Sequence, residues 1–124
     1  MLPKENSVPP DAPKKPRRSA CRLVPAGRGI YELPDAKPTF LAPALARLCK
    51  EHGFQLIFGP AAGLDAFYAE VERGPVRLEV AWDIWSGFCI LSSSDAGYAV
   101  VAELAVDFDA HKDDAIHDEY FELK

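Results

Sequence analysis

The chain has 124 residues and a mass of 13.6 kDa, with 48% hydrophobic residues, 27% charged residues and a net charge of −5 at pH 7. This length suits one hydrophobic core and is too short for two, and so apolar a composition excludes a wholly disordered chain. The three cysteines are an odd number without metal-ligand spacing, which argues against a disulfide framework and favours a reducing compartment. The sequence lacks an apolar run long enough for a secretory signal or a membrane helix, so we expect a cytoplasmic protein without a membrane partner.

The charge is distributed unevenly along the chain. Residues 1–28 carry a net charge of +5, residues 29–106 carry −5, and residues 107–124 carry another −5. An acidic surface repels nucleic-acid phosphates and attracts basic proteins, whereas a basic tail does the opposite. We therefore expect a basic protein partner for the folded part, and contact with nucleic acid only through residues 1–22.

Proline content and charge define three segments. Residues 1–25 contain six prolines among charged side chains, a composition that buries little apolar surface and lacks backbone donors. We predict a disordered basic tail over residues 1–25, a single α+β domain over residues 26–108, and an acidic C-terminal tail over residues 109–124. The C-terminal tail is expected to dock in part through its large apolar residues, which are Ile116, Tyr120, Phe121 and Leu123.

The first half of the domain predicts a strand, a helix and a second strand. Residues 28–33 are a short strand candidate. Leucines recur at helical spacing between Thr39, a suitable N-terminal cap, and Gly53, which favours a left-handed helix end. Residues 54–58 then predict a strand that the Gly-Pro pair at Gly59 ends.

A β-hairpin around Gly74 and Pro75 is the most specific structural prediction. With these two residues as the turn, one face of the hairpin is apolar throughout. The inward pairs are then Val71–Leu78, Ala69–Val80 and Phe67–Trp82. The outward pairs are Glu72–Arg77, Glu70–Glu79 and Tyr68–Ala81.

A second turn follows the hairpin at Ser86 and Gly87. The chain then enters another strand, in which Phe88 pairs with Ile84 if the loop holds three residues or with Trp85 if it holds two. The sequence does not decide between these two registers.

An amphipathic helix completes the domain. Its expected cap is Ser94 or Asp95, and its apolar stripe contains Tyr98, Val101, Ala102, Ala105 and Phe108. The predicted order is β-α-β-β-β-β-α. Because two apolar helix stripes are best buried against one apolar sheet face, we predict an α+β fold with an antiparallel sheet of four to five strands and two helices packed on one face.

The opposite face of the sheet is the predicted binding site. Aromatic side chains supply contact area, and carboxylates among them attract and select a basic protein. The residues predicted to bind the partner are Tyr68, Glu70, Glu72, Glu79, Asp83 and Trp85. The alternative for Trp85 is that it packs against a tail or a loop.

Neither a metal nor another cofactor is expected. One cluster near the C-terminus has metal-ligating residue types, but ligands in a tail lack the outer hydrogen bonds that orient them. Its members are His111, Asp113, Asp114, His117 and Glu119.

Catalytic residues are not expected either. Cys49 and Cys89 occupy positions typical of structural cysteines. His52 suits a helix C-terminus and becomes a candidate base only if residues 59–63 fold over it. Glu70 and Glu79 have the spacing of a glycosidase carboxylate pair, but a domain this small offers no cleft for a sugar.

Small size, acidity and the lack of catalytic motifs accompany the hairpin stretch RLEVAWDIWSG from Arg77 to Gly87. Over residues 27–108 the chain resembles the small acidic α+β immunity proteins that bacteria encode beside polymorphic toxins. The resemblance implies a non-enzymatic, cytoplasmic, antitoxin-like protein that neutralises or escorts a basic partner.

Two other functions are consistent with the sequence. One is a regulatory or scaffold module that uses residues 1–22 to contact nucleic acid or a polyproline-binding domain. The other is a homodimer formed through an exposed strand edge or through the outward sheet face, with no further ligand.

Overall fold

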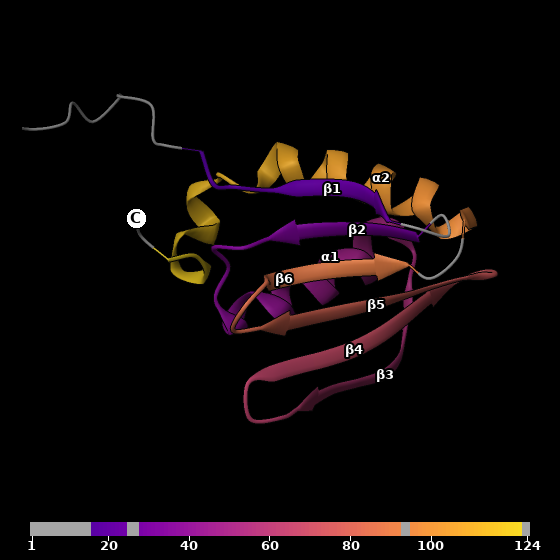
Figure 1. Cartoon of the computed structure of the whole chain (residues 1–124), viewed down its shortest axis with the longest axis horizontal. Coiled ribbons are helices and arrows are strands. Elements are labelled where there is room, and N and C mark those ends of the chain that lie inside the picture. The colour runs from indigo at the N-terminus through magenta and orange to yellow at the C-terminus, as the bar shows by residue number, and fades with distance from the viewer. Residues whose placement is uncertain (1–15, 25–27, 93–94, 123–124) are drawn as a thin grey trace, which may run out of the picture.

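The computed structural model describes residues 16–24, 28–92 and 95–122. In this part of the chain an antiparallel sheet has the order β1-β2-β6-β5-β4-β3, and both α-helices pack behind it (Figure 1). The strands are β1 (Ala20–Val24), β2 (Arg28–Leu33), β3 (Gln55–Ala62), β4 (Ala66–Arg73), β5 (Val76–Asp83) and β6 (Gly87–Ser92). The helices are η3 (Pro38–Phe40), α1 (Leu41–His52), α2 (Asp95–His111) and η4 (Ala115–Tyr120), of which η3 and η4 are 3-10 helices.

The predicted α+β class and the antiparallel sheet are confirmed, but the sheet has six strands where four to five were expected. The additional strand is β1, which lies in residues assigned above to the tail. β1 pairs with β2, placing Cys21 opposite Tyr31. Its five residues gain their backbone hydrogen bonds from β2, a contribution that local composition does not reveal. The predicted disorder of residues 1–15 falls outside the described residues.

The register predicted for the hairpin is confirmed at every pair of β4 and β5, from Phe67–Trp82 to Arg73–Val76. The prediction for the next turn is wrong. Phe88 pairs with Trp82, and neither Ile84 nor Trp85 has a strand partner. Three residues, 84–86, connect β5 to β6, and Gly87 follows them with a φ of 71°. A three-residue loop that ends in a left-handed glycine is a common hairpin connection.

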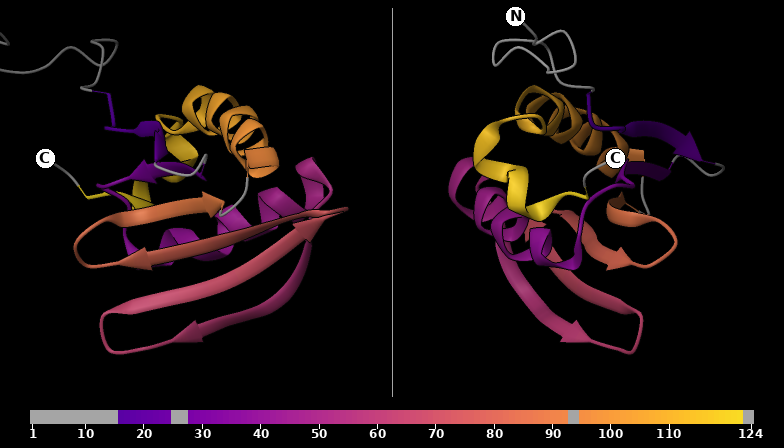
Figure 2. Two further views of the ribbon diagram at one scale, coloured as in Figure 1. Left: turned by 45° about the vertical axis from the view of Figure 1, so that its right-hand side comes forward. Right: turned by 90° about the vertical axis from the view of Figure 1, so that its left-hand side faces the viewer.

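A single hydrophobic core lies between the sheet and the helices. Figure 2 shows α1 and α2 on the same side of the sheet. The inward residues predicted for the hairpin belong to this core, with Val71, Leu78 and Val80 fully buried. Leu104 of α2 is also fully buried, although the predicted stripe did not include it.

Several predicted element ends are corrected. Thr39 lies within η3, and α1 has no side-chain cap. Gly53 is left-handed at the end of α1, as predicted. β3 continues past the cis Gly59-Pro60 peptide to Ala62, because Ala61 and Ala62 still pair with β4. The candidate caps of α2, at positions 94 and 95, fall where side chains are not described.

The C-terminal region differs from a simple acidic tail. Helix α2 extends to His111, beyond the domain end predicted at residue 108. Phe121 is 1% exposed and pairs with Ala36, and Tyr120 packs against the core. Ile116, by contrast, is 78% exposed and does not anchor the segment. The fourth predicted anchor, at position 123, is outside the described residues.

Among the described residues, the helices are too short or too polar to cross a membrane.

Candidate functional site

The outward side of the sheet carries most of the residues predicted to bind a partner. In the described chain no helix or strand lies over this side (Figure 1). The register places alternate strand residues there, opposite in direction to the buried Tyr31, Val80 and Ala69. We call this surface the acidic face, and its charged and aromatic side chains are Arg22, Glu32, Tyr68, Glu70, Glu72, Arg77, Glu79 and Asp83.

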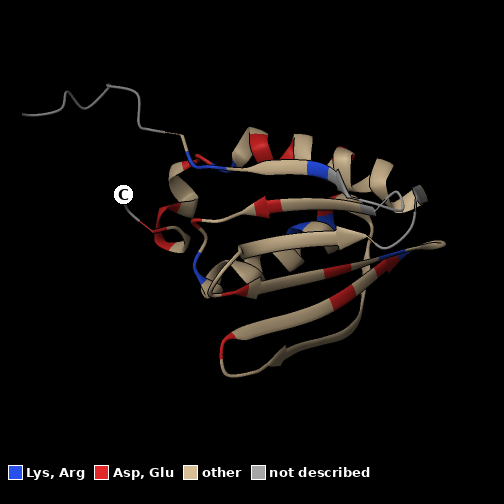
Figure 3. Cartoon of the chain, in the orientation of Figure 1, with Lys and Arg blue, Asp and Glu red and all other residues tan. Residues whose placement is uncertain are grey.

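Carboxylates outnumber bases on the acidic face. Figure 3 shows acidic positions on β2, β4 and β5. Basic positions lie on β1 and at the beginning of β5, next to the hairpin turn. Arg77 lies 3.7 Å from Glu72, and Arg22 lies 3.4 Å from Glu32. Both bases are therefore paired near the margins of the sheet. The remaining carboxylates leave an excess of negative charge over β4 and β5.

Glu70 and Glu79 lie directly opposite each other in the middle of the acidic face. The hydroxyl of Tyr68 donates a 2.6 Å hydrogen bond to Glu70, and this bond raises the pKa of Tyr68 to about 12. Tyr68 therefore remains a neutral donor that holds the Glu70 carboxylate in place. The ring of Phe58 lies 5.9 Å from the Tyr68 ring, so an aromatic pair borders the carboxylates.

Asp83 lies on the acidic face as predicted, whereas Trp85 occupies a different position from the one predicted. Asp83 lies at the end of β5, and its carboxylate accepts hydrogen bonds from the backbone amides of Trp85 and Ser86 at 2.8 and 2.7 Å. Asp83 thus stabilises the turn. Trp85 lies in that turn and not in the strand, with 79% of its surface exposed. Its side chain is available to a partner beside the acidic face, and within the described residues it is not packed against a loop.

A second charged cluster, which the sequence did not indicate, lies between α1 and α2. Arg47 donates two hydrogen bonds to Asp107, at 2.6 and 2.7 Å, and His52 Nε2 lies 2.8 Å from the same carboxylate. The Arg47 bonds, and after them the bond to His52, hold the pKa of Asp107 far below its ordinary range. We call these three residues the Asp107 cluster. The only indication of this cluster in the sequence was the carboxylate of Asp107 beside the apolar stripe of α2.

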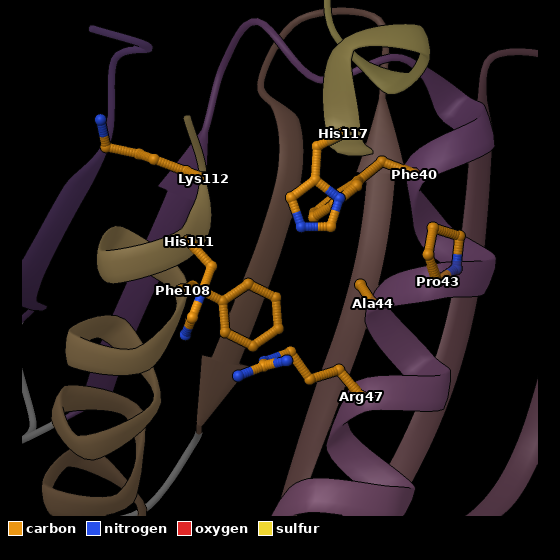
Figure 4. Close-up of a pocket in the computed structure, with 8 residues that line it drawn as sticks. All are labelled: Phe40, Pro43, Ala44, Arg47, Phe108, His111, Lys112 and His117. Carbon is orange, nitrogen blue, oxygen red and sulfur yellow. The ribbon is translucent and has the colours of Figure 1, made fainter. Parts of the chain in front are cut away.

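A small hollow adjoins the Asp107 cluster. Its volume of about 20 Å3 is enough for roughly one water molecule. Figure 4 shows the ring of His117 entering from η4 between α1 and α2, while Lys112 points away. The lining residues are Phe40, Pro43, Ala44, Arg47, Phe108, His111, Lys112 and His117. A space this small and this apolar does not resemble a substrate cleft.

The groups considered for catalysis or for metal binding are held by structural contacts or lie in different parts of the fold. His52 is held by Asp107, and residues 59–63 continue β3 and its turn instead of folding over it. Burial raises the pKa of Cys89 to about 11, so its thiol stays protonated. Cys49 is half-buried on α1. Within the described residues, no three histidine, cysteine or acidic side chains gather as metal ligands.

Comparison of the chain with family models, with curated proteins and with solved structures finds no match. The resemblance to immunity proteins therefore stays a prediction, and the function has to be argued from the surface itself.

Proposed function

We propose that this protein is a non-enzymatic binding module that takes up a basic protein on its acidic face. The observation that carries the proposal is the uncovered outward side of a six-stranded sheet, on which five carboxylates face two paired arginines. Without an uncovered surface of this kind, the net negative charge would be only a general property of the chain.

The physical properties of the acidic face fit a basic protein better than other partners. Its negative potential accelerates encounter with a basic surface and repels phosphate backbones. Tyr68, Phe58 and Trp85 add aromatic contact area next to the charges, and aromatic residues often dominate binding energy. In its cytoplasmic setting, such a module would act as the immunity proteins do, by neutralising or escorting the basic partner.

Charge reversal on the acidic face is the direct test. We expect Glu79→Lys to weaken capture of the partner at least tenfold, because it places a cation opposite Glu70 in the middle of the acidic face. Partners are captured from lysate of the native organism, and affinity is then measured with the purified partner. Glu51→Lys on α1 is the matched control, since it changes the net charge equally at an exposed site away from this face.

Trp85→Ala provides an independent measurement on the same complex. We expect it to weaken binding while changing the free energy of unfolding by less than about 0.5 kcal/mol, because an exposed side chain contributes little to stability. A partner retained equally by the Glu79, Trp85 and control variants contradicts the proposed surface.

The hypothesis that the N-terminal tail binds the partner is tested by deleting residues 1–15. Arg17 pairs with Asp118 at 2.7 Å, and Arg18 pairs with Asp35 at 2.6 Å. These arginines are part of the fold, so a truncation to residue 22 would damage it. A chain that lacks residues 1–15 keeps its partner if the acidic face binds it, and loses the partner if the tail does.

Homodimerisation through β3 is a second candidate, favoured by the composition of that edge. Every residue from Gln55 to Ala62 is exposed, and none of them is charged. Leu56 and Phe58 are 45% and 51% exposed. Two acidic copies repel each other least where the surface is uncharged, and an open strand edge readily pairs with another strand. Register shifts after Leu56 and after Phe58 divide β3 into two short regularly paired segments, at its beginning and at its end.

Sedimentation over a range of concentrations tests this second candidate. We expect Phe58→Lys to weaken any self-association at least tenfold, because an edge lysine opposes strand pairing. Val106→Lys, at an apolar side chain on α2 that is also open to solvent, is the control. A chain that remains monomeric at every concentration excludes the dimer and leaves the acidic face as the binding surface.

A further inference from the structure

The C-terminal segment closes over one end of the core. The backbone amide of Lys37 donates a 2.7 Å hydrogen bond to the carbonyl of Tyr120, and the amide of Glu122 donates a 2.9 Å bond to the carbonyl of Asp35. Between these bonds Phe121 is buried against Phe40, with ring centroids 5.0 Å apart. We call residues 115–122 the C-terminal latch, since these backbone bonds, the buried ring of Phe121 and the contacts of Arg17 with Asp118 and Phe121 hold them to the domain.

His117 is the titratable residue at the inner side of the C-terminal latch. Its ring lies 5.7 Å from the ring of Phe40 and 6.3 Å from that of Tyr120. Its Nδ1 atom is buried and, within the described part of the chain, has no hydrogen-bond partner. A neutral imidazole tolerates this position with Nδ1 as an unprotonated acceptor. A protonated imidazole carries a proton and a positive charge there, without an acceptor, and such burial is costly.

The charges around His117 come from every element packed against it. Arg17 from the segment before β1, Arg47 from α1 and His111 from α2 each disfavour a positive charge on the ring. Asp114, just before η4, is the carboxylate that favours it, but its side chain lies 3.0 Å from His111. Lys112, which also lines the hollow, bonds to Asp113. The surrounding charges therefore do little to offset the hydration that a protonated His117 ring loses in this position.

We propose that the C-terminal latch is acid-sensitive: protonation of His117 weakens its docking and uncovers the aromatic surface around Phe40. The inference does not depend on the proposed binding function, because it concerns contacts of residues 115–122 with Asp35, Lys37 and Phe40 and not the acidic face.

The direction of the pH dependence follows from the sign of the pKa shift. Burial, as the largest cause, lowers the pKa of His117 below its ordinary value of 6.5. The undocked segment therefore binds a proton at a higher pH than the docked segment does. Docking is fully stable above pH 6.5 and weakens as the pH falls below it, until the docked form is protonated as well. Most carboxylates remain ionised down to about pH 5 and therefore do not account for a change between about pH 6.5 and about pH 5.

Amide hydrogen exchange of the full chain, followed by NMR from about pH 7.5 to about pH 5, is the test. After correction for intrinsic exchange rates, the protection of the Lys37 and Glu122 amides is expected to fall several-fold, while that of the Val80 amide in the sheet stays constant. His117→Phe should keep the Lys37 and Glu122 amides protected at all pH values. Phenylalanine fits among the same rings, and no hydrogen bond of Nδ1 is lost.

Two further measurements make the outcome decisive. His111→Gln should lose protection as the wild type does, because His111 contacts Asp107 and Asp114 outside the latch. The ring of His117 in the wild type should titrate below pH 6.5. The proposal is overturned if the latch amides stay protected to pH 5, if His117→Phe loses protection like the wild type, or if His117 titrates at or above 6.5.

Discussion

Gly87→Ala is expected to destabilise the protein by more than about 3 kcal/mol, although it adds a single methyl group. Gly87 has a φ of 71°, and a left-handed conformation costs a residue with a Cβ about 1–2 kcal/mol. A Cβ at this position would lie 2.5 Å from the carbonyl oxygen of Leu33 and 2.7 Å from Pro34 Cα. Both contacts are with backbone, so β2 would have to move away from β6.

Gly74 provides the matched control. It is also left-handed, with a φ of 58°, but a Cβ there would meet no atom within 4 Å. Gly74→Ala should therefore cost only the conformational term of about 1–2 kcal/mol. The two variants are compared by urea unfolding, in which the midpoint should shift while the m-value stays constant. Equal losses in the two variants would show that the approach of β6 to Leu33 and Pro34 is looser than the structure indicates.

Asp107→Asn is expected to lower the free energy of unfolding by about 2 kcal/mol at pH 7, since it removes the charged acceptor of several hydrogen bonds. The carboxylate joins Arg47 and His52 of α1 to α2 and is only 20% exposed. In the variant an amide donor replaces one of the two oxygens that accept from Arg47, and the negative charge beside Arg47, His52 and His111 is lost. Urea unfolding of the wild type and the variant measures the difference.

The pH dependence of this loss is a stricter check. Because the pKa of Asp107 in the folded protein is depressed, its contribution is complete above the ordinary value of 3.8 and declines as the pH falls further. The wild type and Asp107→Asn should therefore converge in stability below about pH 4. Glu103→Gln, which removes an exposed 3.5 Å pair with Arg73, is the control and should cost less than about 0.5 kcal/mol. A loss at pH 7 as small as that of this control would show that the Asp107 cluster contributes little.

The β4–β5 hairpin shows where sequence reasoning succeeds. A turn signal at Gly74 sets the register, and one apolar face from Phe67 to Val71 then agrees with another from Leu78 to Trp82. Two independent local patterns therefore specify the same pairing. A slip of one residue would move every buried side chain of one strand to the outward face. The α+β class and the amphipathic helices follow from similar local periodicity.

The candidate sites show where sequence reasoning is incomplete. Alternation within β4 and β5 placed Glu70 and Glu79 together on an outward face. The same alternation was carried two residues too far: it put Trp85 into the strand, although β5 ends at Asp83 and the Asp83 carboxylate holds a turn there. The Asp107 cluster joins Arg47 to a residue 60 positions away, so no local pattern indicated it.

The sequence by itself determined the fold class, the helix stripes, the hairpin register and the separation of charge along the chain. These properties depend on spacing between near neighbours, which the order of residues states directly. Only the tertiary structure decided that residues 20–24 add a sixth strand, that Arg47 and Asp107 join the helices, and that the Nδ1 atom of His117 is buried without a hydrogen-bond partner among the described residues. Each of these depends on contacts between distant segments, whose free energy arises only when the whole chain folds around one core.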